Sequence, residues 1–225
     1  MRIAHTAYLL IFMSFLANCT RIDSTAQSEV NRKAQEESIA SCPKVPLRST
    51  PLTLTSSQIE NMVKKYGFYE RVLHPRGERS YLYYEMRLDG DLIVVDCTHD
   101  LVWTAGLDMY ASHEKANEVV ATARYAGLRD WRVPTIEELA SLLTPSQSGL
   151  YLNPAFENFR GKSVWSADRV NDQAQNAGWI VRFDEGRIEQ ASVYEFHQML
   201  LVRDLGKLPI DSKTGASLRG LPKDW

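Results

Sequence analysis

Apolar and polar positions divide the chain into an N-terminal apolar run, a polar stretch and a globular part. Residues 7–17 (AYLLIFMSFLA) are apolar except for Ser14. This run matches the hydrophobic region of a signal peptide and is shorter than the roughly 20 apolar residues that cross a bilayer. The alternative is a short helix buried in the fold. Residues 20–41 are polar and lack aromatics, so the sequence that follows offers such a helix no packing partner. We therefore predict a signal peptide over 1–18 and a polar tether over 19–55.

Three segments are predicted to be helical from the period of their apolar positions and from their end signals. Ser or Thr followed three residues later by Glu is the spacing of a capping box, and glycine ends a helix in the left-handed conformation. The segments are 57–66, with Ser57 and Glu60 at its start and Gly67 at its end; 113–126, which ends at Gly127; and a short helix after Pro134 that starts at Thr135 and Glu138.

A hairpin is predicted between the first two helices. Residues 81–88 and 92–95 are rich in strand formers, and Asp89-Gly90 between them is a strong two-residue turn signal. Asp89 and Asp91 would also suit a calcium loop, but the remaining ligands of such a loop are missing from the spacing. We therefore interpret this stretch as a turn.

The last third of the globular part has a strand-like composition. Trp165, residues 179–183 and residues 200–203 favour strands, and residues 184–187 (DEGR) mark a turn between two of them. Residues 206–225 contain Gly, Pro, Ser and Lys with little periodicity. They are predicted to form a tail that follows a domain over 56–205.

Three cysteines follow the apolar run, namely Cys19, Cys42 and Cys97. Leu16-Ala17-Asn18-Cys19 resembles the lipobox of bacterial lipoproteins, in which Cys19 would carry the lipid, although Asn18 departs from the usual Gly, Ala or Ser. Ordinary signal cleavage is the alternative.

If Cys19 carries lipid, Cys42 and Cys97 remain as an even pair, and an oxidising compartment would allow them to form a disulfide. Closing a loop of about 55 residues would stabilise the fold by roughly 3–4 kcal/mol; the alternative is two unpaired thiols.

The charge balance and the motifs of the sequence argue against nucleic-acid binding, metal binding and several common kinds of catalytic site. Lys plus Arg number 26 against 28 for Asp plus Glu, and the pI is about 6.2, which gives no electrostatic footprint for nucleic acid. The five histidines have no metal-ligand spacing, and no nucleophile elbow, phosphate loop or dinucleotide fingerprint is present. We therefore predict a protein without catalytic residues, metal or cofactor.

Several blocks together resemble the Lcl C-terminal domain family, which is common in exported bacterial proteins. The most specific block is residues 130–139 (DWRVPTIEEL); weaker ones are 90–96, 100–103, 153–156, 164–167 and 179–183. The chain departs from the family pattern at His99-Asp100 and Ala167, and Cys97 is a local addition. The resemblance covers about residues 58–205. It implies an α+β, C-type-lectin-like fold, with two main helices flanking a small, twisted, mostly antiparallel sheet with long loops.

Two sets of residues are candidates for core and site. We interpret the tryptophans of the matching blocks as core, and a sugar-stacking platform as the alternative; they are Trp103, Trp131, Trp165 and Trp179. A collagen-like relative implies binding of sulfated polysaccharide, which would use basic residues, although these could equally be solvated or salt-bridged. The basic candidates are Arg129, Arg132, Lys162, Arg169, Arg182 and Arg187. Arg132 can stack on an aromatic ring or make a bidentate contact with a carboxylate such as Asp130 or Asp168.

The resulting functional prediction is a non-enzymatic lipoprotein of the cell envelope, exported and held at a membrane, periplasmic or at the surface, by lipid on Cys19. Its lectin-like domain would recognise polysaccharide or mediate adhesion. The alternative is a structural or assembly lipoprotein that contacts another envelope protein. The polar tether over 19–55 and the basic residues of the tail support the alternative.

Overall fold

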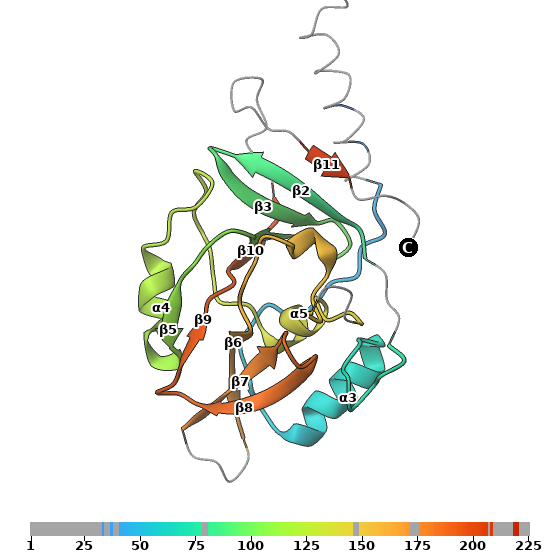
Figure 1. Ribbon diagram of the computed structural model, residues 1–225, viewed down its shortest axis with the longest axis vertical. Coiled ribbons are helices and arrows are strands. Elements are labelled where there is room, and N and C mark those ends of the chain that lie inside the picture. The colour runs from blue at the N-terminus through green and yellow to red at the C-terminus, as the bar shows by residue number, and fades with distance from the viewer. Residues whose placement is uncertain are drawn as a thin grey trace, which may run out of the picture. The chain divides into compact units, whose positions relative to one another are not determined.

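The computed structural model describes residues 41–77, 81–145, 149–171 and 176–206, the single positions 33, 37 and 208, and the backbone of 218–220. The predicted signal peptide and Cys19 lie outside these residues. Residues 42–225 form one compact unit (Figure 1). Within the described part of the chain, no helix has the length and hydropathy needed to span a membrane.

The described elements of this unit form two β-sheets with short helices around them (Figure 1). The α+β class is therefore as predicted, but two sheets replace the one small sheet that was expected, because strand signals do not tell which strands pair. The first sheet has the order β5-β9-β6-β7-β8, and β1 pairs with β6 in parallel. Its strands are β1 (Thr53–Leu54), β5 (Tyr110–Ser112), β6 (Ser163–Val170), β7 (Ala177–Arg182), β8 (Arg187–Ser192) and β9 (Phe196–Gln198).

The second sheet is antiparallel throughout, with the order β10-β4-β3-β2-β11. Asp89 and Gly90 both have positive φ, at 51° and 86°, so the β2–β3 hairpin closes through the predicted two-residue turn. β11 lies within the segment predicted to be a tail, and no periodicity in the sequence indicated it. The strands are β2 (Tyr83–Leu88), β3 (Asp91–Asp96), β4 (Leu101–Thr104), β10 (Val202–Asp204) and β11 (Leu218–Gly220).

The helices begin and end at recognisable caps. α3 (Ser56–Tyr66) ends at left-handed Gly67 as predicted, but its capping box is Thr55 with Gln58, so the predicted box of Ser57 and Glu60 is wrong. The short α5 (Ile136–Ala140) starts at the predicted capping box of Thr135 and Glu138. α4 (His113–Ala121) stops five residues before the predicted end, because the chain already turns at Thr122 and Ala126 has a positive φ. A 3-10 turn, η1, covers Pro154–Phe156.

The four candidate tryptophans are all buried. Trp103 packs edge-on against Phe156, and both belong to the hydrophobic core that lies between the two sheets and the helices. The indole nitrogen of Trp179 donates to the carbonyl oxygen of Leu54 at 3.2 Å, and that of Trp165 donates to Ala111 at 2.9 Å. Each of these two side chains therefore fills the core and holds a neighbouring segment through its N–H.

Residues 42–55, which we call the N-terminal strap, lie against the domain although they were predicted to belong to the tether. Cys42 and Cys97 form a disulfide with a Cα–Cα distance of 5.9 Å. The backbone N–H of Val45 donates to the carbonyl of Thr98 at 2.8 Å. The strap therefore belongs to the same compact unit as the domain predicted over 56–205.

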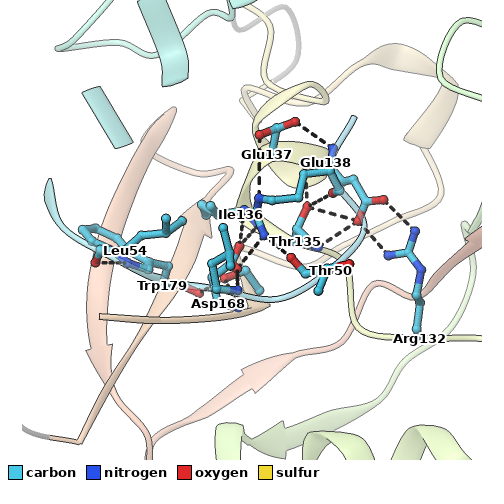
Figure 2. A network of polar contacts seen from close by, with 12 residues as sticks. Thr50, Leu54, Arg132, Thr135, Ile136, Glu137, Glu138, Asp168 and Trp179 are labelled. Atoms are coloured by element: carbon cyan, nitrogen blue, oxygen red, sulfur yellow. Dashed lines mark hydrogen bonds and ion pairs between the residues drawn. The ribbon is translucent and has the colours of Figure 1, made fainter. Parts of the chain in front are cut away.

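One buried carboxylate holds the strap to the rest of the unit (Figure 2). Both oxygens of Asp168, in β6, accept from the guanidinium of Arg48 at 2.8 Å. The same carboxylate accepts from the backbone N–H of Leu52 at 2.6 Å and of Ile136 at 2.7 Å. Asp168 is fully buried, so its charge is compensated by four donors from the strap and from the start of α5.

Replacing this carboxylate is expected to destabilise the protein strongly. Asp168→Asn removes the bidentate counter-charge of Arg48 and leaves only Glu137, 3.8 Å from Nε, as an acidic partner. Breaking a buried ion pair from one side costs about 3–5 kcal/mol. Urea unfolding followed by circular dichroism measures the loss. The matched control is Asp184→Asn, which removes a partly exposed partner of Arg182 and should cost about 0–1 kcal/mol. Equal losses in the two variants would contradict the central role of Asp168.

Candidate functional site

The structure brings three of the six basic candidates together. Lys162 precedes β6, while Arg182 and Arg187 flank the turn between β7 and β8, where Phe183 donates its N–H to the carbonyl of Lys162. Arg129 lies near Trp131, and Arg169 lies toward the other end of β6. The six residues therefore do not form one basic surface.

The cations at the β7–β8 turn are paired with acids of the same turn. Arg182 contacts Asp184 at 2.9 Å and Glu185 at 2.6 Å, and Arg187 contacts Glu189 at 3.3 Å. The hydrogen bond from Arg182 lowers the pKa of the Asp184 carboxyl, against the opposing effect of partial burial. Because each arginine has a carboxylate within the domain, this cluster offers little net positive charge to a polyanion.

Arg132 is also engaged, but not with the predicted partners. Its guanidinium donates to both oxygens of buried Glu138 at 2.8 and 2.6 Å and contacts Asp204 at 3.4 Å. The bidentate contact with a carboxylate is therefore formed, but its partner is Glu138 and neither Asp130 nor Asp168, the two examples that the sequence suggested. Asp168 is occupied by Arg48, a residue of the strap that no local spacing connects with it. Burial opposes the charge of Arg132, but its bonds to Glu138 outweigh that effect and raise its pKa.

Exposed aromatic rings gather instead on strands β5 and β9 of the first sheet. The side chain of Tyr110 is 57% exposed and that of Phe196 is 71% exposed. In the antiparallel register Tyr110 pairs with Gln198 and Ser112 pairs with Phe196, so these four side chains share one face. We call this group, together with Asp108, the aromatic edge. Tyr194, which is also exposed, lies two residues before Phe196.

The aromatic edge continues the side of the sheet that faces the core. Gln198 of β9 pairs with Val164 of β6, and Val164 is fully buried in the hydrophobic core. On β5 and β9 the same face carries buried Ser112 and Gln198 together with the exposed rings of Tyr110 and Phe196. Large apolar side chains that gather on a surface mark interaction sites more often than isolated ones do.

Polar groups of the aromatic edge are held in fixed positions. The Tyr110 hydroxyl donates to the amide oxygen of Gln198 at 3.3 Å, and the Gln198 amide nitrogen donates to Asp108 at 3.4 Å. Gln198 is buried, and Gly161 lies so close to it that a Cβ at this glycine would stand 2.3 Å from the amide oxygen. The two rings can stack on the apolar C–H groups of a ligand. The exposed carboxylate of Asp108 beside them can accept hydrogen bonds from hydroxyl groups.

Two histidines lie on the opposite side of β5 and β9, around Trp165. The ring centroids of His113 and His197 are 5.0 and 4.7 Å from that of Trp165, and both imidazoles meet the indole edge-on. Burial lowers the pKa of both histidines below the ordinary value, and Arg169 lowers that of His113 further. Both rings are therefore neutral at pH 7 and act as part of the packing behind the aromatic edge.

A shallow recess of about 270 Å³ lies elsewhere, between the strap and the ends of β4 and β10. Its exposed carboxylates are bound within the domain, Asp100 by Lys44 and Asp204 by Arg132. In the residues that the structure describes, no group of three His, Cys, Asp or Glu side chains is placed to hold a metal ion. The recess therefore offers no ligand set of its own.

Comparison with known families agrees with the resemblance found in the sequence. The model of the Lcl C-terminal domain family matches residues 92–203, which supports assignment of this part of the chain to that family. The match starts in β3 and ends in β10, and it contains the aromatic edge and both histidines. No curated protein matches the chain.

Sequence reasoning missed the aromatic edge because it chose the tryptophans and the basic residues. The available signal was local. Tyr110 shares its strand face with the polar Asp108 and Ser112, two positions away on either side, and Phe196 stands between Glu195 and His197. A large ring among polar residues in a strand indicates an exposed sheet face. That signal does not say that the two strands pair, so it could not have brought Tyr110 and Phe196 together.

Paired cations predict weak binding to heparin. We expect the protein with Cys19 replaced by Ser to elute from heparin at low salt, because Arg182 and Arg187 are compensated by acids of the β7–β8 turn and of β8. Replacing both arginines by Ala should leave the eluting salt concentration nearly unchanged. Strong retention that falls on this double replacement would instead restore the polyanion site.

Proposed function

We propose that the chain is a non-catalytic lipoprotein of the cell envelope whose domain recognises polysaccharide through the aromatic edge. The single observation that carries the proposal is the pair of solvent-exposed rings, Tyr110 and Phe196, on one face of paired strands beside Gln198 and Asp108. The proposal keeps the C-type-lectin-like architecture that the family resemblance implies, and places recognition on the first sheet.

Stacking on rings suits a saccharide better than the basic residues do. The apolar face of a sugar ring can cover an aromatic ring, while its hydroxyls donate to a carboxylate such as Asp108. The hydrogen-bonded series from Tyr110 through Gln198 to Asp108 fixes these groups before a ligand arrives, so little side-chain entropy is lost on binding. The buried tryptophans offer no such platform, since their rings are covered by core residues.

Removing either ring is expected to weaken polysaccharide binding about tenfold or more. Truncation of a large aromatic anchor at an interface costs more than about 1 kcal/mol, and 1.4 kcal/mol corresponds to tenfold. Binding of the Cys19→Ser protein to envelope and capsular polysaccharides is measured by surface retention or calorimetry, and compared with Tyr110→Ala and Phe196→Ala. Val72→Ala is the matched control, because Val72 is 63% exposed and lies on the turn after α3.

Saccharide binding that is unchanged in both aromatic variants would contradict the aromatic edge as the site.

The second candidate function is contact with another envelope protein. It is favoured by the position of β5 as the edge strand of the first sheet, because an edge strand can accept a partner strand. If these variants lose a protein partner in crosslinked cells and bind no polysaccharide to begin with, the second candidate replaces the first.

The lipid anchor is tested separately from recognition. We expect the full chain to be labelled by radioactive palmitate and to partition into detergent, and Cys19→Ser to lose both properties. Two acyl signals are needed for stable anchoring, so the variant should appear in the soluble fraction. Cys42→Ser is the control, because its sulfur is bound to Cys97 and cannot carry lipid in the folded protein. Unchanged labelling of Cys19→Ser would remove the anchor from the proposal.

A further inference from the structure

The β5–β9 ribbon, residues 110–112 and 196–198, is held to the rest of the first sheet by few described polar contacts. β9 meets β6 through a parallel pairing of Gln198 with Val164. The Trp165 indole donates to the carbonyl of Ala111 at 2.9 Å, and the Ser163 hydroxyl lies 2.7 Å from Nδ1 of His197. Two of these three links depend on Trp165 and His197, so the packing around Trp165 decides whether the ribbon stays attached.

His113 is enclosed on the outer side of this sheet. A Cβ at Gly178 of β7 would stand 2.7 Å from Cδ2 of His113 and 2.9 Å from Trp165, so glycine is needed for both rings to lie over β7. The backbone N–H of His113 donates to the carbonyl of Val193 at 3.0 Å. Among the described residues, neither imidazole nitrogen makes a hydrogen bond of normal geometry. The ring is therefore packed as an apolar group.

Protonation of His113 is disfavoured in the closed structure. Burial is the largest effect, and it lowers the pKa of the imidazole. Arg169 of β6 repels the imidazolium and lowers the pKa further. His113 is also the first residue of the nine-residue α4, where the helix dipole disfavours a positive charge. Backbone groups of Ser166 and Asp168 and the Asp168 carboxylate, which is bound by Arg48, favour the proton but do not outweigh these effects.

His197 also contacts Trp165 edge-on, and charges of both signs lie near it. Burial is again the largest effect and lowers the pKa of the ring. Its Nε2 lies 3.5 Å from Glu195, which attracts a proton, whereas Arg182 of β7 repels one. Protonation of both histidines in the closed form would therefore place two charges against one fully buried indole, which the packing disfavours.

We propose that His113 and His197 form an acid-sensitive latch that holds the β5–β9 ribbon closed at neutral pH and releases it in acid. The latch stands on the packing described above. A second consequence, loss of polysaccharide from the aromatic edge in acid, also rests on the proposed function, because the rings of that edge belong to the ribbon.

The direction of the pH effect on ribbon opening depends on which form binds more protons. In the closed form both imidazoles are neutral because their pKa is lowered, whereas opening exposes them to water and restores an ordinary value of about 6.5. As pH falls below that value, the open form binds protons that the closed form does not, so acid favours opening. At pH 5.5 each histidine that is protonated only in the open form shifts the equilibrium by up to about tenfold.

Hydrogen exchange of the Cys19→Ser protein tests the latch without any ligand. Protection of residues 110–112 and 196–198, corrected for intrinsic rates, should fall from pH 7.5 to pH 5.5, while that of β3 does not. His113→Phe, which keeps a ring over Gly178, and His197→Gln should each reduce the fall, and the double variant should nearly abolish it. His74→Gln is the control, because His74 is bound to the carbonyl of Phe68 in another part of the unit and should leave the fall unchanged.

An equal fall in the double variant and the unmodified protein would overturn the latch, as would a fall of the same size in β3. NMR titration of the histidines in the unmodified sequence covers the case in which a variant does not fold: a pKa of His113 at or above about 6.5 overturns the proposal. Retention of the protein on polysaccharide at pH 7.5 and pH 5.5 tests ligand release. If the ribbon opens in acid while retention is unchanged, ligand release is overturned. If the protein is not retained at either pH, the proposed function is wrong, and hydrogen exchange alone decides on the latch.

Discussion

The arrangement of the whole unit depends on the ion pair between Arg48 and Asp168. Asp168 is fully buried in β6, and its two oxygens accept from the Arg48 guanidinium and from the backbone of Leu52 and Ile136 (Figure 2). Three separate parts of the chain, the strap, the first sheet and the start of α5, therefore meet on one carboxylate. A buried charge is tolerable only when every lone pair has a donor, so none of the three parts can move away without leaving it unsatisfied.

Local signals in the sequence were sufficient for the elements that depend on neighbouring residues. The Asp89-Gly90 turn and the capping box of Thr135 and Glu138 were predictable because each is complete within four residues. The ion pair of Arg48 with Asp168 was not, because 120 residues separate the two and only the fold brings them together. The attachment of the strap was not predictable for the same reason: the strap has little periodicity and is held by distant partners.

In the candidate site, too, some features could be predicted from the sequence and others depend on the fold. Trp103, Trp131, Trp165 and Trp179 could be interpreted from their size as core, and the structure buries all four. The basic residues could not be judged from the sequence, because their charge is cancelled by acids such as Asp184 and Glu138 whose positions depend on turns and caps. Tyr110 and Phe196 share a face only because β5 pairs with β9, and these strands are more than 80 residues apart. Their value as a surface therefore belongs to the fold and not to either residue.

With the proposed lipid anchor at Cys19, the disulfide of the strap would have a mechanical consequence. Tension along the chain from the anchor would enter the ordered unit at Cys42 and pass through the covalent bond to Cys97, immediately after β3. Residues 43–55 lie beyond this point of entry, so the load bypasses them and does not peel them from β6 one hydrogen bond at a time. The force instead reaches the end of β3, which hydrogen bonds to β2 and β4 hold in the second sheet. A ligand on the proposed recognition face would therefore pull on the domain without a load passing along the strap segment that carries Arg48.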